Sequence, residues 1–306
     1  MLFRYEYQNG VWVDLERPSE DELREIASEF SLSKQIEKEM FSPTPTSLVT
    51  DDSCAMLLVL HFPSQNTENN ETKNQEIDFI IGNNFILTVH YEVIEPLHRL
   101  KKLLETREII SGSNELTIDV MLEILFAHLY ASVRDYTDSI ASRLSSVEQD
   151  MFNGHERKTV RSISSISREF LHLESALANQ EEPLRRFFET LMQYDLLDSS
   201  FKERAKCILA ERSQVARLVA AHRAVAIELR ETNTALLGAR QNEIMKTLTT
   251  ITVIVLPLEL IAFIFGMHLP GTPLEQNPNS FFIVMMIMFG AVGCMTLFFA
   301  KKRWIF

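Results

Sequence analysis

Two long apolar segments near the C-terminus constrain this chain more than any other feature. Residues 247–267 read TLTTITVIVLPLELIAFIFGM with a single charged side chain, and residues 281–300 read FFIVMMIMFGAVGCMTLFFA with none. About 20 apolar residues in a helix, at about 1.5 Å rise per residue, match a hydrocarbon layer of roughly 30 Å. Buried helices of a soluble protein are the alternative, but such helices rarely stay apolar on every face. We therefore expect two membrane-spanning helices.

The residues around these two segments predict their orientation. The connecting segment, HLPGTPLEQNPNS (residues 268–280), is rich in turn formers and contains no Lys or Arg. Arg240 and Lys246 precede the first segment, and KKRW (residues 301–304) directly follows the second. Because positive charge is retained on the cytoplasmic side, we expect a multi-pass protein of the inner (plasma) membrane. Both termini would be cytoplasmic, and the loop at residues 268–280 would be external.

The rest of the chain separates into an α/β part and a helical part. Residues 1–112 contain β-rich pieces such as VWVDL and FILTVHY, and SEDELREIASEF opens with a capping-box signature that pairs Ser19 with Glu22. Residues 63–75 are polar and are predicted to form a surface loop. From residue 113 to residue 198 apolar residues recur at helical spacing, with breaks expected near residues 152–156 and 194–200.

One very long helix is expected to join the helical part to the membrane. From residue 199 the helical pattern continues through Gly238 and Pro257 to Gly266, over a length of about 100 Å at 1.5 Å per residue. The predicted organisation is a cytoplasmic α/β domain at 1–112, a cytoplasmic helical region at 113–198, a stalk helix continuing into the first span at 199–267, an external loop at 268–280, the second span at 281–300 and a basic cytoplasmic tail at 301–306.

Composition and motifs exclude several classes of function. The formal net charge of −12 argues against nucleic acid as a partner, because binding phosphates requires a basic face. Cys54, Cys207 and Cys294 form no CxxC pair, so neither a disulfide framework nor a structural zinc site is expected. The sequence has no P-loop, GxSxG, HExxH or GxGxxG motif, so we predict no catalytic residues, no enzyme activity and no bound cofactor.

Polar side chains lie on one face of the first apolar segment. Alternating steps of three and four residues select Asn242, Met245, Thr249, Thr252, Leu256, Glu259, Phe263 and Gly266. An ionised side chain at mid-bilayer costs about 3 kcal/mol, so the carboxylate of Glu259 is expected to face a protein interior. A protonated Glu259 bonded to another helix, or a snorkelling one, is the alternative. We interpret this face as the lining of a wet pathway between several copies of the chain.

The segment NEIMKTLTTITVIVLPLELIAFIFGMH, the turn-rich loop, the second span and the terminal KKRW together resemble the CorA metal-ion transporter family. The resemblance covers the architecture of the whole chain, including WVDLERPSEDEL near its start, while the specific motif is confined to residues 242–268. It implies a funnel-shaped homopentamer in which the stalk helix becomes the pore-lining first span and the second span lies outside it. It also implies inward transport of divalent cations, chiefly magnesium.

The resemblance assigns roles by position. Asn242 would lie at the cytoplasmic pore entrance, and Met245 and Leu256 would form apolar constrictions. Gly266, Met267 and His268 correspond to the Gly-Met-Asn signature of the family at the outer mouth, with His in place of Asn. Imidazole suits Zn²⁺, Co²⁺ or Ni²⁺ better than Mg²⁺ and titrates near neutrality.

The departure at residue 268 bears on the transported cation. With His at this position, proton-coupled zinc uptake, as in the ZntB-type branch, and magnesium uptake are equally supported hypotheses. His268 and Glu259 are the candidate metal ligands. A membrane-anchored helical scaffold or metal sensor that does not conduct is the alternative function, and it should tolerate Leu at position 259. The sequence leaves open the direction of flux, the choice between channel and coupled carrier, and the place of regulatory cation sites.

Overall fold

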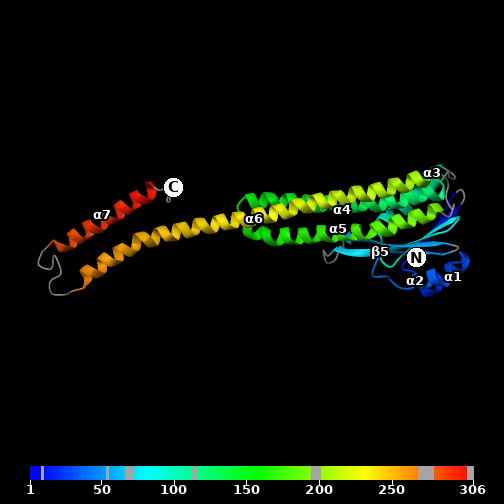
Figure 1. Cartoon of the computed structure of the whole chain (residues 1–306), viewed down its shortest axis with the longest axis horizontal. Helices are drawn as coiled ribbons and strands as arrows, with labels where there is room; N and C mark the ends of the chain where they lie inside the picture. Colours follow the sequence, from blue (N-terminus) through cyan, green and yellow to red (C-terminus); the bar gives the residue numbers. More distant parts are fainter. Residues whose placement is uncertain are drawn as a thin grey trace. The chain divides into compact units, whose positions relative to one another are not determined.

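The N-terminal part of the chain is a sheet with helices on both faces, and the C-terminal part consists of long helices (Figure 1). In this computed structural model the described residues are 1–7, 10–52, 55–65, 72–111, 116–193, 201–267 and 279–301. The strands are β1 (Leu2–Tyr7), β2 (Gly10–Glu16), β3 (Leu48–Asp51), β4 (Met56–Gln65), β5 (Thr72–Ile81) and β6 (Phe85–His90). The helices are α1 (Glu20–Glu29), α2 (Lys34–Glu39), α3 (Glu95–Ser111), α4 (Ile118–Phe152), α5 (Glu156–Gln193), α6 (Phe201–Gly266) and α7 (Ser280–Lys301).

Two compact units divide the chain. The N-terminal unit comprises Met1–Arg230, and the C-terminal unit comprises Glu231–Phe306. Helix α6 contributes to both, since it is one continuous helix across the boundary. The N-terminal unit therefore contains the sheet, α1 to α5 and the first part of α6, and the C-terminal unit contains the remainder of α6 together with α7.

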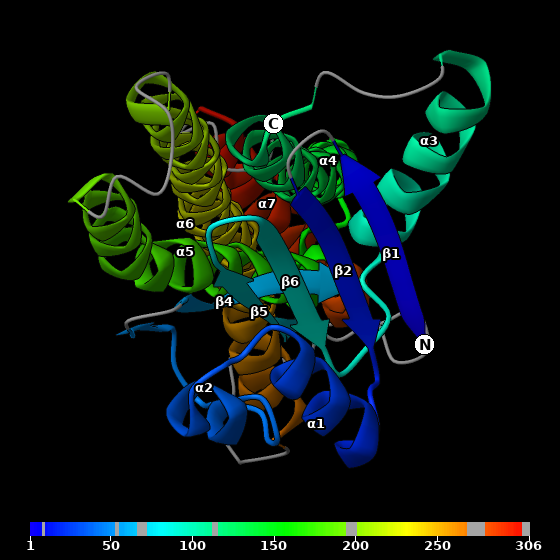
Figure 2. The same ribbon diagram turned by 90° about the vertical axis from the view of Figure 1, so that its right-hand side faces the viewer.

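The strands described in the N-terminal unit form one six-stranded sheet in the order β1-β2-β6-β5-β4-β3. Only β2 and β6 run parallel in this sheet, and the other neighbouring strands are antiparallel. Side chains alternate between the two faces along each strand. Figure 2 shows α1 and α2 on one face of the sheet and α4 and α5 on the other.

Helices α1 and α2 cover the first face because each presents apolar residues at helical spacing. In α1, Leu23, Ile26 and Ala27 are buried, and α2 contributes Ile36. They pack on strand residues of alternating register, including Val13 and others in the same core cluster. The predicted capping box is confirmed, since the Ser19 side chain accepts a hydrogen bond from the Glu22 backbone N–H and the Glu22 carboxylate accepts one from the Ser19 N–H.

Helices α4 and α5 cover the second face as an antiparallel pair. Phe126 of α4 stacks on Phe79 of β5 with ring centroids 5.0 Å apart, and it also meets Phe188 of α5 at 5.9 Å. The predicted break between these helices is confirmed, because α4 ends at Phe152 and α5 begins at Glu156. Gly154 has a φ of 89° there, a conformation that favours glycine.

The first part of α6 packs along α4 and α5 through ion pairs. The Arg204 Nε donates to Asp119 Oδ2 at 2.8 Å. The buried Arg212 donates to the Leu177 carbonyl oxygen at 2.7 Å and to Glu181 Oε2 at 2.8 Å. These bonds fix the start of α6 within the N-terminal unit.

Helix α6 is continuous from Phe201 to Gly266, as predicted, and it contains Pro257 within its last turns. The predicted fold class, an α/β domain with a long helix and two apolar C-terminal helices, is thereby confirmed. The predicted surface loop at residues 63–75 was wrong at both of its ends. Residues 63–65 belong to β4 and residues 72–75 to β5, because the antiparallel pairing of these strands continues from Pro63–Asn74 to Gln65–Thr72 despite the polar sequence.

Candidate functional site

The C-terminal unit exposes its apolar surface. Among the described residues, two helices are long and apolar enough to cross a membrane, namely α6 and α7. Their most apolar stretches are 6% and 0% buried inside the structure, so neither is the core helix of a globular domain. Phe263 and Phe289 are 71% and 69% exposed. Large exposed apolar patches mark surfaces that contact a membrane or other proteins.

The residues of the predicted polar stripe all lie on α6 or directly after it. Asn242, Met245, Thr249, Thr252, Leu256, Glu259, Phe263, Gly266 and Met267 are all exposed. Met267 follows the last helical residue, and its backbone N–H still donates to the Phe263 carbonyl oxygen at 3.1 Å. His268 lies outside the described residues, as do residues 269–278 of the connecting loop. A Cβ at Gly266 would meet no atom within 4 Å.

The face of α6 opposite this stripe is the sheltered one. Between residues 246 and 265, the side chains that are not fully exposed are Lys246, Thr250, Ile254, Pro257, Leu258, Ile261 and Phe265. At 3.6 residues per turn they centre roughly half a turn away from the stripe. Among these side chains only Thr250 is buried and the others are half-buried, so the apolar side of α6 is partly sheltered. Helix α7 runs in the opposite direction to α6 (Figure 1). The stripe with Glu259 lies on the exposed side of the helix.

The polar groups of the stripe keep oxygen atoms available. The Thr252 hydroxyl donates to the Leu248 carbonyl oxygen at 2.9 Å, which uses its proton within the helix and leaves its lone pairs to accept. No cation pairs with the carboxylate of Glu259 within the part of the chain that the structure describes. Hydroxyl, amide and carboxylate oxygens are the ligands and water-shell acceptors that hard cations such as Mg²⁺ prefer.

The N-terminal unit contains a buried ion network that the sequence did not reveal. It lies at the carboxyl ends of the parallel strands β2 and β6, where Asp14 Oδ2 lies 3.2 Å from His90 Nε2 and pairs with the Lys101 ammonium of α3. Thr88 donates to the other carboxylate oxygen. Burial by itself would raise the pKa of Asp14, but the His90 hydrogen bond and the charges of His90 and Lys101 hold that pKa below its usual value. This network fastens α3 to the sheet.

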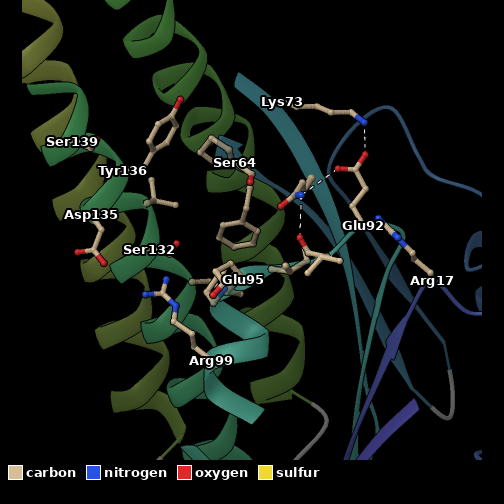
Figure 3. Close-up of a pocket in the computed structure, with 18 residues that line it drawn as sticks. Arg17, Ser64, Lys73, Glu92, Glu95, Arg99, Ser132, Asp135, Tyr136 and Ser139 are labelled. Carbon is tan, nitrogen blue, oxygen red and sulfur yellow. Dashed lines mark hydrogen bonds and ion pairs between the residues drawn. The ribbon is translucent and has the colours of Figure 1, made fainter. Parts of the chain in front are cut away.

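A cavity of about 980 Å³ opens between β4 and β5, the start of α3 and α4 (Figure 3). Its described lining includes the cations Arg17, Lys73 and Arg99 and the carboxylates Glu92, Glu95 and Asp135. Lys73 pairs with Glu92, which also accepts a bond of 3.2 Å from the Gln75 amide. Its three cations and three carboxylates balance, and none of its described lining residues belongs to α6 or α7. Within the described residues no group of three or more His, Cys, Asp or Glu side chains is arranged to hold a metal.

Comparisons with known proteins agree with this architecture. The family model described as CorA-like Mg²⁺ transporter protein matches residues 7–303. A cobalt/magnesium transport protein CorA from Methanocaldococcus jannaschii is 22% identical over 96% of this chain and 91% of its own length. A magnesium transport protein CorA from Campylobacter jejuni is 22% identical over 97% of this chain and 92% of its own length.

The solved structure titled as the complete CorA magnesium transporter from Methanocaldococcus jannaschii superposes with a TM-score of 0.85. It is 21% identical and covers 98% of this chain and 93% of that chain, so the fold is shared. The family is one of membrane transporters, which agrees with the predictions of a membrane protein and of no enzyme activity. Because the family model spans nearly the whole sequence, the chain belongs to the CorA-like Mg²⁺ transporter family.

Proposed function

We propose that copies of this chain assemble, as a homopentamer, around a water-filled pathway lined by the polar stripe of α6, and that divalent cations cross the membrane through it into the cytoplasm. A single α6–α7 hairpin cannot enclose such a pathway, so assembly is a requirement of the proposal. Both termini lie in the cytoplasm in this arrangement, as the basic residues beside the spans indicate.

The observation that carries the proposal is the opposition of two faces on α6. The sheltered face is apolar apart from Lys246 and Thr250, whereas the exposed face carries Glu259 and the threonine hydroxyls. An exposed carboxylate within an apolar span is unfavourable against lipid, by about 2.5–3.5 kcal/mol on insertion scales. The same carboxylate is favourable beside water and a cation, which a conduit between copies would provide.

Each part of the stripe then has a role in the pathway. Cations enter at Met267 and His268 and pass Glu259 while still partly hydrated. Met245 and Leu256 form apolar constrictions that close by dewetting, so a small change in helix tilt is sufficient to gate the pathway. Asn242 lies at the cytoplasmic end, where its amide oxygen accepts from the water shell of the cation.

We propose magnesium and zinc as the two candidate transported cations. The names of the relatives, cobalt/magnesium and magnesium transport proteins, support Mg²⁺. The imidazole of His268 supports Zn²⁺, with Co²⁺ and Ni²⁺ as further candidates. A histidine and a glutamate in one pathway also suit coupling to protons, because an imidazole and a carboxylate can each carry a proton.

The test is cation uptake by the purified full chain in liposomes, with and without a pH gradient, for the wild type and Glu259→Gln. We expect uptake by the wild type, and a changed rate or a changed pH dependence in the variant. Glu243→Gln is the matched control, because Glu243 is an exposed carboxylate on the same helix outside the stripe. Equal uptake by all three proteins at every pH would remove the role of Glu259. No uptake by any of them would support the scaffold or sensor.

A second experiment separates the two cations. His268→Asn restores the signature residue of the family, and we expect it to shift the ratio of magnesium to zinc uptake towards magnesium. A ratio that is unchanged within error would contradict cation contact by His268, while leaving the pathway itself intact.

A further inference from the structure

A second group of buried ionisable side chains lies in the N-terminal unit, on the sheet face that α1 and α2 cover. Glu76 and Asp78 are two residues apart on β5, so their side chains point to the same face. His61 of β4 lies directly opposite Glu76 in the strand register. Glu76 is 9% exposed and Asp78 is 1% exposed. Two carboxyl groups are therefore held side by side away from water.

Glu76 is well supplied with hydrogen-bond donors. The Thr44 backbone N–H donates to its two carboxylate oxygens at 2.9 and 2.8 Å, and the Thr44 hydroxyl donates at 3.0 Å. His61 Nε2 lies 3.6 Å from Glu76 and 2.9 Å from the Thr44 carbonyl oxygen. Burial works to raise the pKa of Glu76, but the bonds from His61 and Thr44 prevail and lower it. Glu76 is accordingly the charged member of the pair.

Asp78 is almost without donors. Its Oδ1 is buried and has no hydrogen-bond partner. Its Oδ2 lies 3.4 Å from the Tyr91 hydroxyl, but the single proton of that hydroxyl has a closer acceptor, the Met40 carbonyl oxygen at 2.9 Å. An ionised Asp78 would thus be a buried anion with at most one weak hydrogen bond, which is a costly arrangement.

The groups that face Asp78 do not compensate its charge. The described groups that act most strongly on its pKa are Glu76 on its own strand, Tyr91 after β6 and Glu39 at the end of α2, and none of these three is a cation. His61, on the neighbouring strand β4, interacts with Glu76. Burial, followed by the nearby charge of Glu76, raises the pKa of Asp78 well above its usual value.

We propose that Glu76 and Asp78 form a proton-binding pair. In this pair the proton stays on Oδ1 of Asp78, which donates a hydrogen bond to the Glu76 carboxylate. A proton in this position accounts for the orphaned oxygen, because it turns a buried acceptor without a donor into a donor facing an acceptor. It also leaves one negative charge where two would repel each other.

The proton has a structural consequence, because Glu76 fastens the segment between α2 and β3 through Thr44. His61 extends the same network to the helices, since its carbonyl oxygen accepts a bond of 2.7 Å from Gln180 of α5. Gln180 in turn accepts from the Tyr130 hydroxyl of α4 at 3.0 Å. Loss of the proton places two carboxylates together in a medium of low dielectric constant. Release of Thr44 relieves their repulsion by letting water reach them.

Thermal unfolding of the full chain in detergent, between about pH 5 and about pH 8, tests the pair. Because the folded state keeps a proton that the unfolded state has lost above about pH 4, the wild type loses stability as the pH rises. Asp78→Asn keeps the shape and an N–H donor but cannot titrate. We therefore expect the unfolding temperature of the variant, relative to that of the wild type, to rise with pH.

The difference in unfolding temperature between the wild type and Asp78→Asn isolates the contribution of Asp78. His61 is present in both proteins, so its contribution cancels in the difference. Asp138→Asn, at an exposed aspartate of α4, is the control and should follow the wild type at every pH. Parallel curves for the wild type and Asp78→Asn would overturn the proposal.

Hydrogen exchange gives a local readout. At the same alkaline pH, we expect peptides that contain Thr44 to exchange faster in the wild type than in Asp78→Asn, with no difference at acidic pH. Equal exchange at both pH values would contradict the release of this segment. If the variant does not fold, infrared spectra of the wild type with ¹³C-labelled aspartate decide the matter. A protonated aspartate band at neutral pH is expected, and its absence would overturn the proposal.

Discussion

The two units of the molecule treat polar and apolar groups in opposite ways. In the N-terminal unit large apolar side chains such as Trp12 and Phe126 are buried, and the buried charge of Asp14 has its partners within the same chain. In the C-terminal unit Phe263 and Phe289 are exposed, as is Glu259. The N-terminal unit buries its large apolar side chains and pairs Asp14 within the chain, whereas the C-terminal unit leaves its apolar residues exposed, as a membrane-spanning hairpin does. Under the proposed function, further copies of the chain would surround its polar stripe.

The largest effect on the free energy of unfolding should come from removing a partner of the buried Asp14 carboxylate in the N-terminal unit. Lys101→Ala removes the ammonium that pairs with the fully buried Asp14, and a buried charge that loses a partner costs about 3–5 kcal/mol in unfolding free energy. Chemical denaturation of the full chain measures it. Lys102→Ala, at the next and exposed residue, should stay within about 0.5 kcal/mol of the wild type. Equal losses for the two variants would show that the pair contributes nothing specific.

The next effect tests whether the exposed surface of α6 has two environments. Ile251 and Thr252 are neighbours and both exposed, but only Thr252 lies on the stripe. Under the proposed function, Ile251→Asp places a charge outside the stripe, against lipid, at a cost of about 3 kcal/mol, whereas Thr252→Asp places it beside the water of the pathway. We expect less folded protein in membranes for Ile251→Asp alone. Similar yields of the two variants would remove the distinction between the faces.

A smaller effect should follow from the local sequence signal that begins α1. Ser19→Ala removes the side chain that accepts from the Glu22 N–H, and the loss of such a cap costs about 1 kcal/mol in unfolding free energy. Ser145→Ala, at an exposed position within α4, lacks that role and serves as the reference. If both substitutions had the same small effect, the capping box would be dispensable to the stability of this unit.

The smallest effect concerns how the unfolding temperature depends on pH. The hydrogen bond with Glu76 raises the pKa of His61 above its ordinary value of 6.5. A group with a raised folded pKa adds stability that is complete below the unfolded pKa and is lost as the pH rises through the folded one. The advantage of the wild type over His61→Gln in unfolding temperature should therefore shrink from acidic to mildly alkaline pH. A constant difference would mean that the His61 charge does not matter.

Features carried by neighbouring residues were predictable from the sequence. The capping box needs only Ser19 and Glu22, and the two apolar helices follow from long, almost uninterrupted runs of apolar residues. The continuity of α6 was also predictable, because helical spacing persists on both sides of Gly238 and Pro257. The polar stripe was found in the same way, and its exposure agrees with a role outside the chain, although its place around a pathway stays a prediction.

Features that depend on tertiary pairing could not be found in this way. Asp14, His90 and Lys101 are far apart in the sequence, and only the parallel pairing of β2 with β6 and the packing of α3 bring them together. Glu76 and Asp78 are buried because helices cover both faces of the sheet, which also bury Ile77 and Phe79 of β5. The extended β4–β5 hairpin was missed because backbone pairing holds strands together even where their side chains are polar.

Pro257 gives α6 a property that no side chain of the stripe supplies. Proline has no N–H, so the carbonyl oxygen of Val253, one turn earlier, cannot receive its usual helical bond from residue 257. That oxygen lies in the backbone between Thr252 and Glu259, inside the apolar stretch, where an unsatisfied acceptor costs several kcal/mol. Solvent has to reach it or another group has to donate to it. The main chain itself thus requires a hydrogen-bond donor at this point of the span, either water or a neighbouring group.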